Sequence, residues 1–117
     1  AMNVESHFAK SAPEVVATYR RLLEVARALG PVVETPKKTS IHLVARTAFA
    51  GVAGRRSSLI LTLKSARDIR SRRVEKRDQT SANRWHVDIR LQRPSDVDHQ
   101  LTAWVSAAYK LAGGRPT

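Results

Sequence analysis

Residues 39–64 read TSIHLVARTAFAGVAGRRSSLILTLK and contain two runs in which successive side chains point to opposite faces of an extended chain. The more apolar faces carry Ile41, Leu43, Ala45, Thr47 and Phe49 in the first run, and Leu59, Leu61 and Leu63 in the second. Alternation with a period of two is typical of strands that bury one face. The runs are separated by Gly54-Arg55-Arg56-Ser57, and a short break that contains glycine predicts a hairpin. We therefore predict an antiparallel sheet at the centre of the protein.

Further strands are predicted around this centre at residues 32–35, 72–80 and 84–92. The first of them is short and stands beside Pro36, which places it near an edge of the sheet. No glycine, proline, asparagine or aspartate marks a turn between Lys37 and Ala50. The sequence leaves open whether residues 40–53 form one long bent strand or two short strands joined near Arg46.

Two helices are predicted, one on either side of the strands. The first is expected to begin with Ser11 as its N-cap, with Glu14 at the capping-box spacing, and to end at Gly30-Pro31. The second is expected to begin with Ser95 as its cap and to end at Gly113-Gly114. Their apolar stripes consist of Val15, Tyr19, Leu22, Leu23, Ala26 and Leu29, and of Val97, Leu101, Trp104, Ala108 and Leu111.

The order of helix, about five strands and helix predicts an α+β two-layer sandwich. Both helices are expected on one face of the antiparallel sheet, which leaves the other face open to solvent or to a partner. A chain of 117 residues supports a single domain, which we place at residues 3–114. Residues 1–2 are interpreted as an addition ahead of the natural start, and residues 115–117 as a flexible tail. Trp85 and Trp104 are expected to pack against each other in the core.

The charge of the chain is strongly positive. Lysine and arginine number 21 and the acidic residues 10, which gives a net charge of +11. Twelve of the basic and four of the acidic residues lie between Arg55 and Arg93, so this window carries +8. A concentrated basic region indicates a polyanionic partner such as DNA, RNA or an acidic protein. The alternative is that the arginines serve only the solubility of the protein.

Several classes of protein are disfavoured by the composition. The chain has no cysteine, which excludes disulfides and thiolate chemistry, and its histidines (His7, His42, His86 and His99) lack the spacing of metal ligands. We therefore expect no metal and no cofactor. The N-terminus lacks a signal-peptide core, and no apolar run approaches the ~18 residues that cross a bilayer. A cytoplasmic protein without membrane association is expected, and its oligomeric state stays undefined.

The open face of the predicted sheet is the most informative surface for function. His42 and Arg46 are expected to point outward from one strand, Lys64 from the next, and His86 and Arg90 from the last. Arginine offers a planar fork and lysine a point charge, and both suit phosphate groups. The alternative is an ordinary solvated face with cross-strand charge pairs.

The hairpin tip adds two arginines, Arg55 and Arg56, which would touch a DNA backbone if the tip acted as a wing. The alternative is a solvated basic turn. The candidate nucleic-acid-binding or anion-binding residues are thus Arg46, Arg55, Arg56, Lys64, His86 and Arg90.

No motif for catalysis stands out. Asp88 lies two residues from His86 on one strand face and could orient it as a base, but a His-x-Asp pair is a weak signal. No serine or cysteine is marked as a nucleophile by an elbow motif. We therefore do not expect an enzyme.

Several segments together resemble a known family. They are Phe49-Ala50, Leu61-Thr62-Leu63-Lys64, Trp85-His86-Val87-Asp88-Ile89-Arg90-Leu91, Pro94-Ser95-Asp96-Val97-Asp98, and Trp104 with Ala108-Tyr109. The chain from about Val4 to Ala112 is similar to the uncharacterised bacterial domain-of-unknown-function family five-six-five-five, and more loosely to the YjbR group, which shares its helix–strands–helix layout with frataxin.

The resemblance implies the same α-β-α order and little about activity, because fold likeness alone transfers no function. YjbR-type proteins have been proposed to bind DNA. Frataxin binds iron through an acidic first helix, whereas the first helix expected here carries Arg20, Arg21 and Arg27 against two glutamates, which disfavours iron handling. Our functional hypothesis is a non-enzymatic nucleic-acid-binding module that contacts phosphates. The alternative is a protein-interaction or small-anion-binding module.

Overall fold

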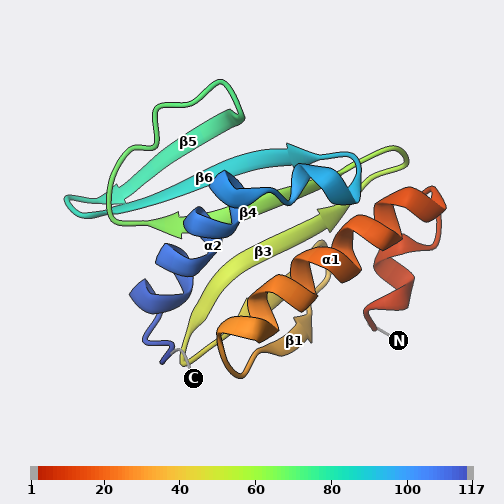
Figure 1. Cartoon of the computed structure of the whole chain (residues 1–117), viewed down its shortest axis with the longest axis horizontal. Helices are drawn as coiled ribbons and strands as arrows, with labels where there is room; N and C mark the ends of the chain where they lie inside the picture. The colour runs from red at the N-terminus through yellow and green to blue at the C-terminus, as the bar shows by residue number, and fades with distance from the viewer. Residues whose placement is uncertain (1–2, 116–117) are drawn as a thin grey trace.

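The computed structural model describes residues 3–115 and confirms the predicted α+β fold. Six strands, one more than the five expected, form a single antiparallel sheet in the order β1-β2-β3-β4-β6-β5. They are β1 (Val33–Pro36), β2 (Ile41–Val44), β3 (Ala48–Gly54), β4 (Leu59–Ser65), β5 (Val74–Ser81) and β6 (Arg84–Leu91). Helices α1 (Pro13–Leu29) and α2 (His99–Leu111) both cover the same face of this sheet, as predicted (Figure 1). The predictions for residues 1–2 and 116–117 lie outside the described residues.

The long central segment is two strands, which settles the alternative left open by the sequence. A turn at residues 45–47 separates β2 from β3, and the Ala45 N–H donates to the Thr47 carbonyl oxygen at 3.0 Å. The Thr47 N–H in turn donates to the carbonyl of Ala112, beyond the end of α2, at 3.1 Å. The turn is thus held by a partner 65 residues away, which explains why no local turn residue marks it.

The core lies between the sheet and the two helices. Leu61 on β4 is fully buried and stands between Val52 on β3 and Ile89 on β6 in the register of the sheet. Tyr19, Leu22, Leu43 and Leu101 are also buried, as predicted. Leu23 and Trp104 are half-buried and pack against this core. The aromatic pairs among residues 3–115 are Phe8 with Tyr19 and Phe49 with Tyr109, so the predicted pairing of Trp85 with Trp104 is not found.

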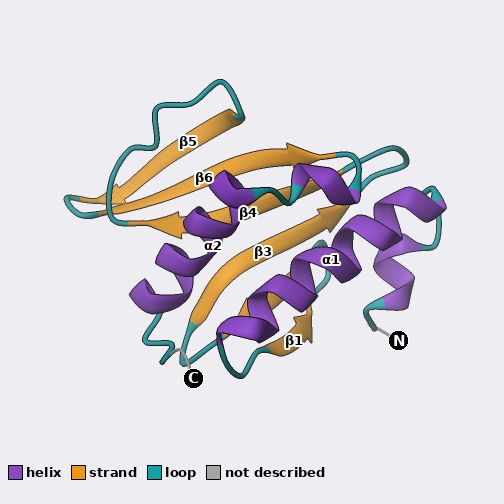
Figure 2. Ribbon diagram, viewed as in Figure 1, coloured by secondary structure: helices purple, strands orange, loops and turns teal. Residues whose placement is uncertain are grey.

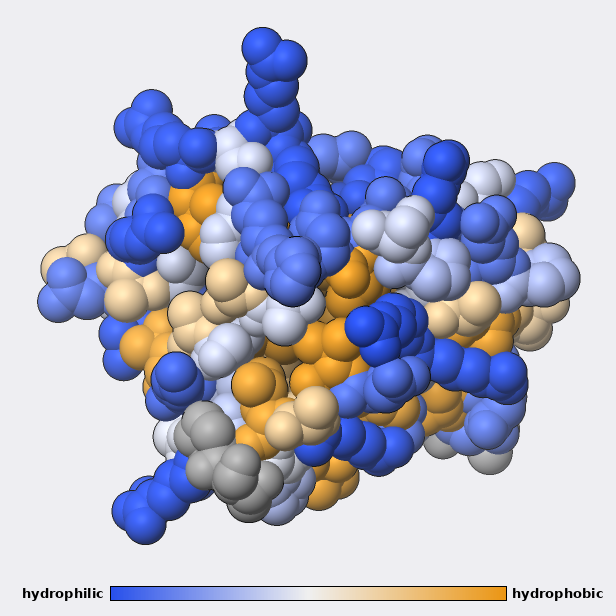
Figure 3. All heavy atoms as spheres, in the orientation of Figure 1, coloured by the Kyte–Doolittle hydropathy of each residue, from blue (hydrophilic) through white to orange (hydrophobic). Residues whose placement is uncertain are grey.

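Both edges of the sheet are protected. At one edge β1 is only four residues long and ends at Pro36, as predicted. At the other edge β5 exposes seven of its eight residues, among them Glu75, Lys76, Arg77 and Asp78. The loop that joins β4 to β5 runs around the outside of this strand (Figure 2), and hydrophilic side chains gather along the same side of the molecule (Figure 3). Charged edge strands resist pairing with other chains.

The start of α1 differs from the prediction, because Ser11 does not cap it. The N-cap position belongs to Ala12, which offers no side-chain acceptor. The Ser11 hydroxyl donates instead to the carbonyl of Arg55 at 2.6 Å, and the Ala12 N–H donates to the carbonyl of Arg56 at 2.8 Å. The chain before α1 is therefore used to fix the turn between β3 and β4.

The start of α2 also differs, because Asp98 rather than Ser95 is its cap. Ser95 falls within a short 3₁₀ helix, η2 (Pro94–Asp96), that precedes α2. The Asp98 carboxylate accepts the Leu101 N–H at 3.0 Å and the Arg73 guanidinium at 2.8 Å. These two contacts, the backbone bond first, lower the pKa of Asp98. An aspartate three residues before the first bonded N–H is an ordinary capping arrangement, and the predicted cap Ser95 lies one turn too early.

A hydrogen bond ties α1 to the edge strand β1. The Tyr19 hydroxyl donates to the Glu34 carboxylate at 2.6 Å, and Arg27 lies 3.4 Å from the other Glu34 oxygen. Tyr19 is only 3% exposed. Burial, and then the hydrogen bond to Glu34, raise the pKa of Tyr19 well above the usual range of a tyrosine.

We expect Tyr19→Phe to lower the free energy of unfolding by about 1–3 kcal/mol at neutral pH, because a hydrogen bond to a charged acceptor is lost. The raised pKa means that the Tyr19 contribution is complete below the unfolded-state pKa of about 10 and declines as pH rises above it. Denaturant unfolding between pH 8 and 11 should thus show a steeper alkaline loss in the unmodified protein than in the variant. Parallel pH profiles would contradict the contribution of Tyr19.

Candidate functional site

The uncovered face of the sheet carries the polar residues that the alternation predicted. In the register of the strands, Thr62 lies between Gly51 on β3 and Asp88 on β6, and Gly51 is in turn opposite His42 on β2. The Thr62 hydroxyl donates to the Asp88 carboxylate at 2.6 Å. One row further, Lys64 on β4 is paired directly with His86 on β6, and His86 with Asp78 on β5. The sheet thus brings Lys64 and His86 together, as expected.

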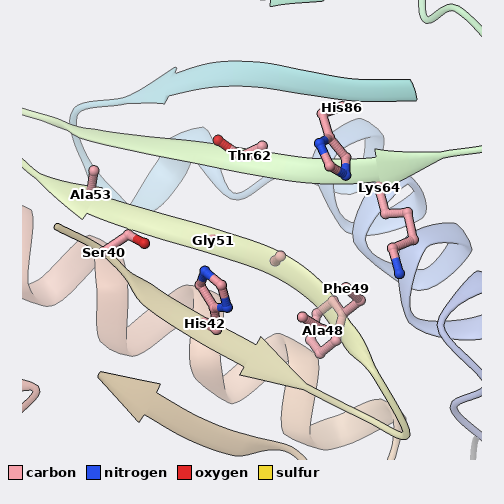
Figure 4. Close-up of a pocket in the computed structure, with 10 residues that line it drawn as sticks. Ser40, His42, Ala48, Phe49, Gly51, Ala53, Thr62, Lys64 and His86 are labelled. Atoms are coloured by element: carbon pink, nitrogen blue, oxygen red, sulfur yellow. The ribbon is translucent and has the colours of Figure 1, made fainter. Parts of the chain in front are cut away.

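A hollow of about 280 Å³ lies on this face. Figure 4 views it from the side opposite the helices: His42 points into it from β2, while His86 and Lys64 extend toward it from the other side. Gly51 lies between them, and a Cβ atom there would be 4.0 Å from both His42 Cδ2 and Thr62 Cβ. The missing side chain therefore keeps the hollow open.

The chemistry of the hollow favours an anion. The side chains of His42, Lys64 and His86 have no hydrogen-bond or ion-pair partner among residues 3–115, and no carboxylate lines the hollow. An ammonium group and two imidazoles can all donate to phosphate or carboxylate oxygens. Within the described chain, no group of three His, Asp or Glu side chains is arranged to hold a metal ion.

Two of the predicted residues are engaged elsewhere. Arg90 points to the uncovered face, but its guanidinium forms an ion pair with Glu75 at 2.9 Å and donates to the Ser58 hydroxyl at 2.8 Å. Arg46 does not point outward from a strand, because it lies in the turn at residues 45–47. Its side chain packs against Gly113, where an added Cβ would lie 3.1 Å from both Cβ and Cδ of Arg46.

Arg55 and Arg56 lie at the opposite end of the sheet from Lys64. They precede β4, whereas Lys64 is near its end, and a strand rises ~3.3 Å per residue, so the two sites are roughly 20 Å or more apart. Both side chains are exposed, but the main chain of this turn is bound by residues 11 and 12, so it is not a projecting wing. A phosphate contact by Arg55 or Arg56 stays a prediction, and the structure does not join it to the hollow.

Ion pairs neutralise part of the basic window. Five of its twelve cations have an acidic partner within residues 3–115. They are Arg70 and Arg77, which share Asp68, and Arg73, Lys76 and Arg90. The acidic residues of the window are already subtracted in its charge of +8, and seven of its twelve cations have no such partner among residues 3–115.

Five of the cations without such partners among residues 3–115 lie where β4 and α2 end. We define this basic end as Arg46, Lys64, Arg67, Arg84 and Lys110. Lys64, Arg67 and Lys110 line one groove, Arg84 adjoins the pair formed by Ser65 and Trp85, and Arg46 touches Gly113 just beyond α2. Figure 1 shows the end of β4, the β5–β6 turn and the end of α2 on the same side of the molecule. Within the described residues, no member of the basic end forms an ion pair.

Arg67, Arg84 and Lys110 were not singled out from the sequence. Lys110 stands in the last turn of α2, where a cation also stabilises the negative end of the helix dipole. Arg67 and Arg84 do not stabilise a helix end in this way, since Arg67 is in a loop and Arg84 begins β6. Their proximity depends on the crossing of α2 over β4, a long-range contact without a local sequence signal.

The family model described as "Domain of unknown function (DUF5655)" matches residues 4–112, almost the whole chain. The protein belongs to this family. Membership agrees with the resemblance noted from the sequence and leaves its activity undefined. Neither a curated protein nor a solved structure gives a significant match. In the part of the chain that the structure describes, neither helix has the length and apolar character needed to cross a bilayer.

Proposed function

We propose that this DUF5655 domain is a non-enzymatic module that binds nucleic acid, mainly through phosphate groups. The observation that carries the proposal is the basic end, where five cations from five separate segments lie on one side of the molecule without ion-pair partners among residues 3–115. Phosphate contacts by lysine and arginine supply most of the affinity of such proteins and little sequence readout. A cytoplasmic location and the looser likeness to YjbR-type proteins form part of the same proposal.

The arrangement of His86 and Asp88 supports a binding role over catalysis. The Asp88 carboxylate is engaged by the Thr62 hydroxyl, while His86 stands opposite Lys64 and Asp78 in the strand register. A general base needs a partner that orients it and a proton within hydrogen-bond reach. Asp88 thus has a structural partner, and among residues 3–115 no hydrogen bond orients the His86 side chain.

The proposal is tested by fluorescence anisotropy with a labelled single-stranded oligonucleotide of about 20 residues, a duplex of the same length and an acidic polypeptide as competitor. We expect binding to nucleic acid at about 50 mM salt, with similar affinities for unrelated sequences. Stronger binding to the acidic polypeptide than to any oligonucleotide would support a protein-interaction module instead.

The hollow around Gly51 favours a second candidate function, the binding of a small anion. Its lining combines the donors of His42, Lys64 and His86 with small apolar residues and contains no carboxylate, and its volume of about 280 Å³ suits a ligand the size of a phosphate ester or a small organic acid. Titration with inorganic phosphate, followed by the NMR signals of His42 and His86, distinguishes the two. Saturation at low phosphate with no binding of oligonucleotides would favour the small anion.

A further inference from the structure

A second hollow, of about 500 Å³, lies between the end of β4, the loop that follows and α2. Apolar side chains, Ile69, Trp104 and Leu111, form part of its lining. Three cations of the basic end, Lys64, Arg67 and Lys110, line it as well, and no carboxylate does. Lys64 also lines the hollow on the uncovered face, so its side chain borders both hollows. The groove thus combines an apolar surface with an unneutralised positive rim.

Trp104 is held in place within this groove. Its indole is half-buried and packs against the core, and the guanidinium carbon of Arg73 lies 5.8 Å from the centre of the ring. Arg73 is itself fixed, because it donates to the Asp98 carboxylate at 2.8 Å and to the Asp96 carbonyl at 2.6 Å. A ring that is already ordered loses little freedom when a ligand stacks on it.

We propose that this groove binds an unstacked base of a single-stranded nucleic acid, with Trp104 as the stacking surface and Lys64, Arg67 and Lys110 on the flanking phosphates. The inference rests on the proposed function and adds the class of nucleic acid. Bases in a duplex are stacked on their neighbours, whereas those of a single strand are free to lie on an aromatic ring. A positive groove with an aromatic platform is the arrangement by which single strands are bound without sequence preference.

An acidic peptide is the competing occupant of the groove. Its carboxylates would pair with the three cations, but they would leave the indole and its apolar neighbours without a matching group. A nucleotide has both parts, a planar base and a phosphate, so it complements the whole lining. We therefore assign the groove to nucleic acid, and the acidic peptide is tested as the alternative occupant.

The test uses the Trp85→Phe variant, in which Trp104 is the only tryptophan. Its fluorescence is followed during titration with oligothymidylate and with an abasic oligomer of the same length and phosphate charge. We expect oligothymidylate to quench the fluorescence and to bind roughly 5- to 150-fold more tightly than the abasic oligomer, as loss of one stacked base predicts. Trp104→Leu, which keeps an apolar side chain against the core, should bring the two affinities together when they are measured by the anisotropy of labelled oligomers. Circular dichroism confirms that this variant folds.

The outcomes distinguish base stacking on Trp104 in the groove from phosphate binding by the cations of the basic end. Equal binding of both oligomers without quenching would overturn the stacking site and leave phosphate binding in place. Binding of neither oligomer would overturn the proposed function and the stacking site together. Quenching by polyglutamate that exceeds quenching by oligothymidylate would assign the groove to an acidic protein and overturn the inference.

Discussion

Replacing Lys64, Arg67 and Lys110 together by glutamine should weaken binding to a single-stranded oligonucleotide by roughly 10²- to 10³-fold at about 50 mM salt. Each phosphate contact releases condensed counterions and contributes about −0.7 to the slope of log affinity against log salt for single strands. Three lost contacts should therefore also flatten that slope by about 2 units. All three side chains line one groove and lack ion-pair partners within residues 3–115, so their replacement breaks no ion pair in this part of the chain.

A variant with the same change in net charge serves as the control for this result. Lys10, Arg55 and Arg56 are exposed, and they lie near the start of α1 and the β3–β4 turn, at the opposite end of β4 from Lys64. If the phosphate contacts are confined to the basic end, replacement of these three residues by glutamine should lower the affinity by less than about tenfold, through the weaker long-range field alone. Equal losses in the two variants would mean that net charge, and not the basic end, determines binding. A larger loss in the control would place the phosphate contacts at Arg55 and Arg56.

Truncation of Leu61 should produce the largest loss of stability. Leu61 is fully buried at the centre of the sheet, and α2 packs across its strand, so Leu61→Ala leaves a cavity that the surrounding structure cannot fill. We expect the free energy of unfolding to fall by about 2–5 kcal/mol in urea denaturation. The neighbouring Ile60 points to the uncovered face and is half-buried. Ile60→Ala should therefore cost clearly less, and a loss below about 1 kcal/mol for Leu61→Ala would contradict its place in the core.

The fold could be predicted from the sequence where apolar residues recur with the period of a strand or a helix. Alternation in β4 placed Leu61 in the core, and the helical stripes placed Leu22 and Leu101 against it. Prediction was weaker where a tertiary contact replaces a local signal. Ser11 has the chemistry of a cap but bonds to the β3–β4 turn instead, and the unmarked turn before β3 is held by the end of α2. A local pattern does not reveal such partners.

The candidate site was predicted only in part for the same reason. Alternation identified Lys64 and His86 as neighbours on the uncovered face, and the register confirms that they are paired. It did not reveal that Arg90 is paired with Glu75, since the two belong to different strands. Nor did it bring Lys110 beside Lys64, because that proximity depends on how α2 crosses the sheet. Charge counts from a sequence include every cation, whereas the structure separates the paired from the unpaired.

The salt dependence of binding tests the central claim most directly. Wild-type protein should be titrated with a single-stranded oligonucleotide at several salt concentrations between about 50 and 300 mM. If the five cations of the basic end contact phosphates, the slope of log affinity against log salt should be about −3 to −4 for a single strand. A slope near zero, or no binding at the lowest salt, would contradict the proposal that this domain binds nucleic acid through its basic end.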